Sequence, residues 1–350
     1  MSQTAQTPPT MRTVLSHIAV PLIMGAVMAF AYLGGFHHPS PNHLRIDVVG
    51  SGPVATATTQ KLQTAFGDAA DLTLVSSESD ATASIEHRDI AGAFVLSPTK
   101  PALLVSTGAS DTQAVTVERM FQPVAAGAGL PLDIRDVVPV DPDADPSGQS
   151  LFFYLVALTV GGYGTAIAIG VAAASKPMRT RIGLGVGAAA VNTLLATGIA
   201  TLVFHALPSH QWQIGLLAFV YCLAVMAFGI ALHSLIGRFT TLAMVTLFVG
   251  LNFTTSGGVF PPALQPGFFA ALHHIWIGAS LNEAGRNLTY FPDLGIGTDV
   301  LKIVGWVVVG GLLLTLAALR ERSAHRAGAV TTALGEAEMV DEETEEELVG

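Results

Sequence analysis

The sequence predicts a polytopic α-helical membrane protein with six transmembrane helices and an extracytoplasmic α/β domain inserted between the first and second helices. Two observations predict this class. Only 12% of the residues are charged and 51% are hydrophobic, whereas a soluble domain carries about 25% charged residues. The apolar residues also gather in long uninterrupted segments, while the charges concentrate in residues 44–145 and in the C-terminal tail.

The six predicted spans have the length that a bilayer requires. A hydrocarbon core of about 30 Å needs about 20 apolar residues in a helix. The segments that reach or approach this length are residues 14–36, 151–174, 182–207, 214–236, 240–256 and 300–319. The first follows a short N-terminal segment, residues 1–13, and is too long for a signal-peptide core and lacks an A-x-A cleavage pattern. We therefore predict an uncleaved helix there.

The lysines and arginines of the short loops predict the orientation. Cytoplasmic loops carry an excess of these residues. In a six-helix arrangement one side receives Arg12, Lys176, Arg179, Arg181, Arg238, Arg320, Arg322 and Arg326, while only Arg45, Arg286 and Lys302 flank helices on the other. Both termini are thus predicted to be cytoplasmic, in a multi-pass protein of the inner (plasma) membrane, with residues 37–149 outside.

The predicted outer segment, residues 37–149, alternates strand and helix patterns. We expect strands at residues 44–50, 72–76, 90–96, 102–106 and 132–138, and helices at residues 54–66, 80–87 and 111–126. Such alternation is typical of a compact α/β domain. The Asp- and Pro-rich residues 141–148 predict a stiff linker back to the membrane.

The remaining segments predict a five-helix membrane domain, residues 151–320, and a tail. Residues 257–299 are apolar and aromatic but interrupted by proline and glycine, which favours a broken outer hairpin packed on protein. Residues 321–350 have no periodic apolar face and contain eight acidic residues between Glu336 and Glu347. They predict a disordered acidic cytoplasmic tail.

Several classes of chemistry are excluded by the residues themselves. The sequence contains no GxxxxGK[ST], HExxH or GxSxG motif, and Cys222 is its only cysteine. Nothing in it is basic enough for nucleic acid. Gly50 and Gly52 superficially match a dinucleotide fingerprint, but Pro53 after them favours an ordinary turn into a helix. We therefore expect no enzyme activity, no cofactor and no metal.

Polar residues inside the spans are few. Asn192, His233 and Asn252 are expected in the bundle interior, since an unpaired polar group in lipid is costly. They either line a path or bond across helices, and the second reading is favoured. Glycines 161, 162 and 164, and glycines 183, 185 and 187, predict faces for close helix packing.

The order of the segments and several local motifs resemble a known family. Residues 46–49 look like its first outer strand, residues 89–96 (DIAGAFVL) its "xIxGAxVI" strand, and residues 255–261 (TSGGVFP) the segment after its fifth helix. The chain resembles the type-2 ABC transporter permease superfamily, particularly the branch similar to the YhgE/Pip phage-infection proteins.

The resemblance implies a homodimeric or heterodimeric membrane component that exports hydrophobic or amphipathic molecules, driven by a separate cytoplasmic ATPase. It also implies that the loop at residues 175–182, with Lys176, Arg179 and Arg181, transmits the ATPase motion. A permease subunit of an export system is therefore the leading hypothesis. The alternative is a non-transporting scaffold or receptor whose outer domain binds envelope components or proteins.

Overall fold

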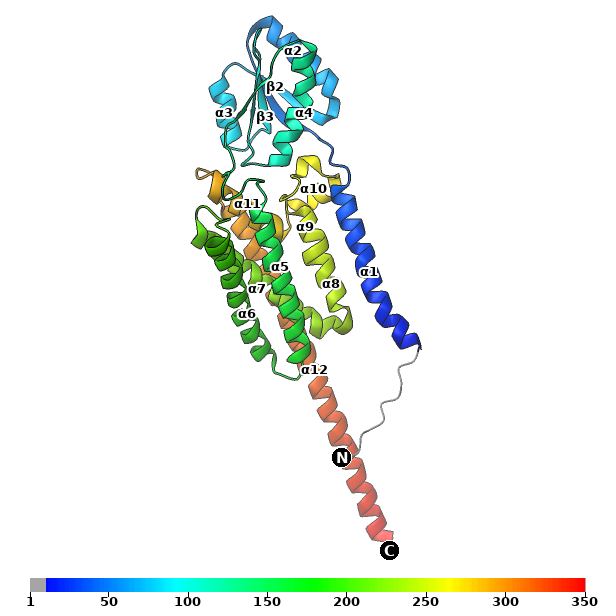
Figure 1. Cartoon of the computed structure of the whole chain (residues 1–350). Helices are drawn as coiled ribbons and strands as arrows, with labels where there is room; N and C mark the ends of the chain where they lie inside the picture. Colours follow the sequence, from blue (N-terminus) through cyan, green and yellow to red (C-terminus); the bar gives the residue numbers. More distant parts are fainter. Residues whose placement is uncertain (1–10, 350) are drawn as a thin grey trace.

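The computed structural model describes residues 11–349 and places a small α/β domain on one end of an elongated bundle of helices (Figure 1). In chain order the domain lies between the first helix, α1 (Met11–Phe36), and the next long helix, α5 (Ser150–Ala172). The bundle end that carries the domain is called the domain end below. The opposite end, at the turn between α5 and the following helix, α6 (Met178–Gly198), is called the loop end. The expected N-terminal segment, residues 1–13, falls almost entirely outside the described residues.

The domain is built on a five-stranded sheet with the order β2-β1-β3-β4-β5. Neighbouring strands are parallel except β3 and β4, which are antiparallel. The short connection at residues 96–101 explains this exception, because a parallel pair needs a crossover of a dozen or more residues. The strands are β1 (Leu44–Val49), β2 (Ala70–Val75), β3 (Gly92–Val95), β4 (Ala102–Val105) and β5 (Asp133–Asp136).

Helices cover both faces of this sheet. They are α2 (Gly52–Phe66), α3 (Glu78–Glu86) and α4 (Asp111–Gly127). On one face Leu62 of α2 and Phe121 of α4 pack with Val48. On the other, Ile85 of α3 packs with Val49. Val48 and Val49 serve opposite faces because successive strand side chains alternate.

The bundle is organised around α7 (Gln211–Ile236), which packs against α5, α6 and α12. Tyr221, Cys222 and Val225 of α7 are fully buried. Helix α1 instead packs against α8 and α9 at the side of the bundle. The other elements are α6 (Met178–Gly198), a π-helical turn (Ile199–Val203), η3 (Gly237–Phe239), α8 (Thr240–Val245), a second π-helical turn (Thr246–Leu251), α9 (Asn252–Thr255) and α12 (Gly297–Val349).

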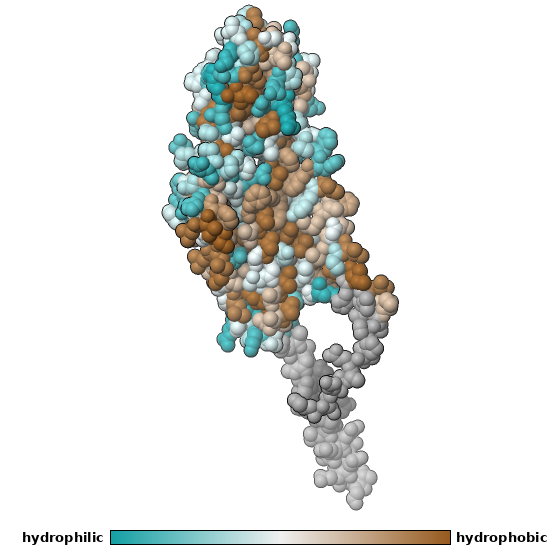
Figure 2. All heavy atoms as spheres, in the orientation of Figure 1, coloured by the Kyte–Doolittle hydropathy of each residue, from teal (hydrophilic) through white to brown (hydrophobic). Residues whose placement is uncertain are grey.

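Within the described residues, five helical segments are long and apolar enough to cross a membrane. They are Ile18–Phe36, Ser150–Ala172, Met178–Val203, Gln211–Thr255 and Gly297–Ser323. Leu194 and Leu202 of the third are 72% and 79% exposed, and Figure 2 shows apolar side chains over the flank of the bundle and hydrophilic ones over the domain. These surfaces are those of a membrane protein.

The sequence predicted six spans, one more than these five segments, because two predicted spans fall within Gln211–Thr255. This segment has 45 residues, about twice the length that a straight helix needs to cross a hydrocarbon core. The chain turns at Gly237, whose φ of 54° suits glycine, and α8 packs back on α7. The predicted spans at residues 214–236 and 240–256 are separated at this turn.

The region between α9 and α12 contains only short helices, which lie at the domain end (Figure 1). They are η5 (Pro262–Leu264), α10 (Gly267–His273) and α11 (Ile277–Tyr290). At about 1.5 Å per residue, the 14 residues of α11 fall short of a bilayer core.

The structure assigns helix α12 as far as Val349, and the disorder expected over residues 321–350 stays a prediction. Alanine and glutamate, abundant in this stretch, are strong helix formers.

Candidate functional site

The three cations that the sequence analysis assigned to an ATPase-coupling loop differ in their exposure to solvent. Lys176 and Arg179 are exposed at the loop end. Arg181 is only 3% exposed, and its guanidinium donates to the Ser234 hydroxyl at 2.7 Å and to the Glu321 carboxylate. Arg181 therefore ties α6 to α7 and α12, and only the other two cations of this loop are open to a partner.

Asn252 lies at the centre of a buried hydrogen-bond chain that crosses the bundle. Its side-chain oxygen accepts from the backbone N–H of Gly278 at 2.9 Å, and its amide donates to the Tyr221 hydroxyl at 3.0 Å. That hydroxyl bonds to Thr159, which donates to the carbonyl of Leu155. The chain links α9, α11, α7 and α5 and leaves none of these polar groups facing lipid.

Asn192 and His233 also make contacts between helices. Asn192 donates to the carbonyl of Leu158 at 2.9 Å and approaches the Cys222 sulfur at 3.4 Å. His233 is half-buried and packs on Gly170, where a Cβ would come within 2.7 Å of its side chain. The glycine is required because the two helices approach so closely. Neither residue, nor Asn252, lines the hollows described next.

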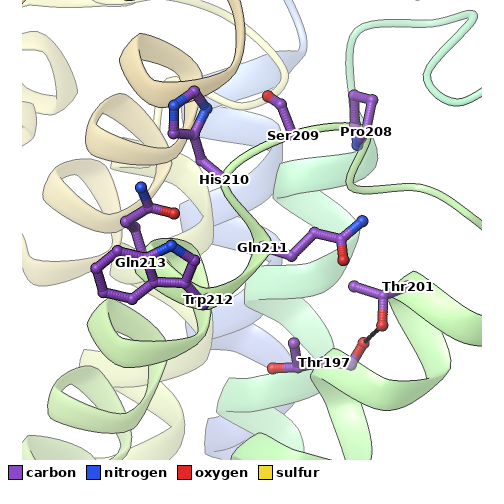
Figure 3. A pocket seen from close by; sticks show the side chains of 8 residues that line it. All are labelled: Thr197, Thr201, Pro208, Ser209, His210, Gln211, Trp212 and Gln213. Carbon is purple, nitrogen blue, oxygen red and sulfur yellow. Dashed lines mark hydrogen bonds between the residues drawn. The ribbon is translucent and has the colours of Figure 1, made fainter.

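A polar hollow of about 550 Å³ lies between the domain end of α6 and the start of α7 (Figure 3). None of its lining residues is Asp, Glu, Lys or Arg, so hydroxyl, amide and ring nitrogen groups supply its polarity. The lining residues are Thr197, Thr201, Pro208, Ser209, His210, Gln211, Trp212 and Gln213.

A second, apolar hollow of about 460 Å³ lies between α5 and α6 at the same end. Tyr154 lines it, and the Tyr154 hydroxyl is 2.7 Å from the Thr197 hydroxyl of the polar hollow. The two hollows therefore adjoin across this hydrogen bond. The apolar hollow is lined by Ala144, Ser150, Phe153, Tyr154, Ala157, Ala196, Ile199, Ala200, Phe204 and Ala206.

The loop that shapes both hollows has unusual backbone and unmet polar groups. His205 and His210 have φ of 53° and 49°, a conformation that non-glycine residues adopt rarely and at a cost. Ser209 Oγ and Gln213 Oε1 are buried without a hydrogen-bond partner among the described residues. Most buried polar atoms in proteins have a partner, so these two are unmet polar atoms beside the hollow.

A cluster of buried charges joins the α/β domain to the bundle. Arg88, with a φ of 59°, follows α3 and donates to the Glu283 carboxylate at 2.5 Å and to the Asn287 side chain at 2.6 Å, both on α11. Arg286 donates to the other oxygen of Glu283 at 2.9 Å. Glu283 therefore bridges two arginines, one from each part of the molecule.

The electrostatics of this cluster favour the ionised carboxylate. Burial raises the pKa of Glu283, but the charges of Arg88 and Arg286 outweigh burial and lower that pKa to about 2. Burial also lowers the pKa of the nearby His273, whose Nδ1 is 2.8 Å from the carbonyl oxygen of Thr255. The junction is thus a fixed charge centre at neutral pH.

No protein-family model matches the chain, and none of the curated proteins matches it.

Sequence reasoning missed the functional residues that depend on tertiary contact. Arg88 and Glu283 lie 195 residues apart, and neither belongs to a local motif. The hollow residues Ser209, before α7, and Gln213, in its first turn, belong to no sequence motif either. The available signal was the density of hydrogen-bonding residues between Thr197 and Gln213 beside a membrane span.

Proposed function

We propose that the chain is the permease subunit of an ABC-2-like export system, moving a hydrophobic or amphipathic substrate out of the cell with energy from a separate cytoplasmic ATPase. In this proposal the chain crosses the plasma membrane six times, with the turn at Gly237 separating the fourth and fifth spans. Both termini are cytoplasmic and the α/β domain lies outside. The chain has no catalytic site of its own.

The observation that carries the proposal is the anchored basic loop. Lys176 and Arg179 are exposed at the turn between α5 and α6, where an ATPase surface has access to them. Arg181 Nε donates to the carbonyl of Lys176 at 3.2 Å, while the rest of its guanidinium is bound to α7 and α12. A push on the exposed cations is therefore passed to the central helix through rigid contacts.

The free face of α6 supports a dimer. Gly183 and Gly187 are exposed, and a Cβ added at either would meet no atom within 4 Å. Small residues on an exposed membrane helix permit the close approach of a second helix. A second copy or a related subunit is the partner that this proposal assigns to the face.

Purification from mild detergent tests the proposal. The tagged full chain is isolated from membranes of its host, and nucleotide hydrolysis is measured in the eluate. We expect a co-eluting ATPase that is lost in the double variant Lys176→Ala, Arg179→Ala and retained in the control Arg238→Ala, which removes an exposed cation at the same end. An ATPase that stays bound to the double variant would contradict the coupling role.

The alternative function, a scaffold or receptor, is favoured by one observation. The Arg88–Glu283 contact fixes the α/β domain to the bundle, as a static platform requires. A stable complex with envelope material that contains no nucleotidase, and that the double variant leaves intact, would support this alternative.

A further inference from the structure

We propose that the two adjoining hollows bind one membrane lipid with an uncharged, hydroxyl-bearing head group. The head occupies the polar hollow and an acyl chain occupies the apolar hollow. A glycosyl-diacylglycerol has this chemistry. The role of such a lipid as substrate rests on the proposed export function, whereas its binding is measured independently of transport.

Because no acidic or basic side chain other than His210 lines the polar hollow, a lipid with an uncharged head group fits it best. Its lining includes hydroxyls from Thr197, Thr201 and Ser209 and amides from Gln211 and Gln213, and it contains no Asp, Glu, Lys or Arg. A phosphate or ammonium head would be partly desolvated there with no opposite charge to pair with, which is costly. Hydroxyls meet no such penalty.

Two specific atoms in the polar hollow require partners that the protein does not supply. Ser209 Oγ both donates and accepts, whereas Gln213 Oε1 only accepts. Both are buried and unpaired in the described structure. A sugar hydroxyl can pair with either kind of atom, so a polyhydroxyl head would complete both hydrogen bonds when the two side chains turn toward the hollow.

The apolar hollow is shaped to take a chain. Small side chains at Ala157, Ala196 and Ala200 leave the space open, and Phe153 and Phe204 form its exposed apolar border. The π-helical turn Ile199–Val203 on this side is rare in helices and frequent at functional sites. Both hollows fall within the range of about 300–1,000 Å³ that is common for ligand sites.

The depth of the two hollows matches that of a lipid. Trp212 is 73% exposed at the rim of the polar hollow, and tryptophans at the ends of membrane helices mark the head-group level. The apolar hollow lies among the candidate spans Ser150–Ala172 and Met178–Val203. The polar site thus faces the head groups and the apolar site faces the acyl chains.

Photo-crosslinking in nanodiscs tests the proposal. The purified full chain is placed in phosphatidylcholine nanodiscs with a small equal fraction of either a glucosyl-diacylglycerol or a phosphatidylglycerol, each with a diazirine in one acyl chain. Labelled peptides are quantified by mass spectrometry. We expect labelling of residues 150–157 and 196–206 by the glucosyl lipid to exceed labelling by the anionic lipid on the order of tenfold, a ratio equivalent to one or two hydrogen bonds.

Matched variants locate the two parts of the site. Ser209→Ala and Gln213→Leu should each reduce the glucosyl preference about threefold to tenfold, while Ser175→Ala on the exposed turn leaves it unchanged. Ala200→Trp, or the milder Ala157→Phe if the first fails to fold, should abolish labelling of residues 196–206. Leu194→Trp, on the exposed side of α6, should not.

The outcomes decide between a built site and ordinary lipid contact. Equal labelling by both lipids, or labelling that the Ser209 and Gln213 variants leave unchanged, would overturn the head-group assignment and indicate boundary lipid only. Labelling that survives both filling variants would overturn the chain site. The nanodiscs contain no ATPase, so lipid labelling does not depend on the proposed export function. If labelling is specific but no ATPase co-purifies with the chain, the lipid site is supported and the permease function is rejected.

Discussion

The two ends of the bundle each contain a buried ion pair between arginine and glutamate, but the buried partner differs. At the domain end the carboxylate of Glu283 is the hub, 16% exposed and held by Arg88 and Arg286. At the loop end the guanidinium of Arg181 is the hub, 3% exposed, and its partner Glu321 is 31% exposed. The first pair closes a junction, whereas the second steadies a loop whose other cations remain in solvent.

At one end the charged side chains hold two parts of the protein together, and at the other end some of them are free to contact a partner. At the domain end Arg88 and Arg286 both pair with Glu283, so these three side chains are not available to a partner. The loop end buries one cation and exposes Lys176 and Arg179. The predictions below test whether the two ends differ in this way.

The largest effect is expected from Glu283→Ala. Removal of the hub leaves two arginines uncompensated at a buried junction, which costs roughly 3–5 kcal/mol. Thermal unfolding of the detergent-solubilised chain measures the loss, and Glu86→Ala, on the exposed surface of α3, is the control. A melting temperature equal to that of the control variant would show that the junction does not hold the domain.

Acid should weaken the domain end next. The folded pKa of Glu283 lies near 2, below its ordinary value of 4.5, so its contribution is fully present above pH 4.5 and is lost as the pH falls toward 2. The shift corresponds to roughly 3 kcal/mol. The difference in stability between the native chain and Glu283→Gln should shrink over this range. A constant difference would contradict the assignment.

At the loop end, Arg181→Ala should cost about 2 kcal/mol, because charged hydrogen bonds to Ser234 and Glu321 are lost while Glu321 retains access to water. Arg181→Lys keeps the charge but not the forked geometry, so it should recover only part of the loss. Chemical denaturation of the solubilised protein compares the two variants. Full recovery by lysine would show that charge alone is needed there.

The smallest effect on stability is expected at the exposed cations. Lys176→Ala and Arg179→Ala should each change the unfolding free energy by no more than about 0.5 kcal/mol, although we expect the double variant to lose the proposed ATPase partner. Circular dichroism melts of the single variants check this expectation. A loss comparable to that of Arg181→Ala would erase the distinction between anchor and contact residues.

Much of the fold follows from local pattern. The apolar runs predicted the five segments that are long and apolar enough to cross a membrane, and the strands of the domain lie within a few residues of the predicted segments. The predicted break between residues 236 and 240, which contains Arg238, coincides with the turn inside Gln211–Thr255. The antiparallel pairing of β3 with β4 was not predicted, although the length of residues 96–101 contains that information.

The candidate site was less accessible to sequence reasoning. Arg181 looks equivalent to Arg179 in sequence, and only the approach of α7 and α12 distinguishes a buried anchor from an exposed contact. The pairing of Arg88 with Glu283 depends on how the domain sits on α11. The hollows depend on where α6 ends in a π-helical turn, and a single residue of extra winding leaves no signature in hydropathy.

The position of Cys222 has a practical consequence. The only thiol of the chain is fully enclosed by α7 and its neighbours, so maleimide reagents have no native target in the folded protein. Single cysteines introduced at Glu86 and at Thr180 then report sidedness directly in whole cells, with no background to remove and no compensating mutation in the core.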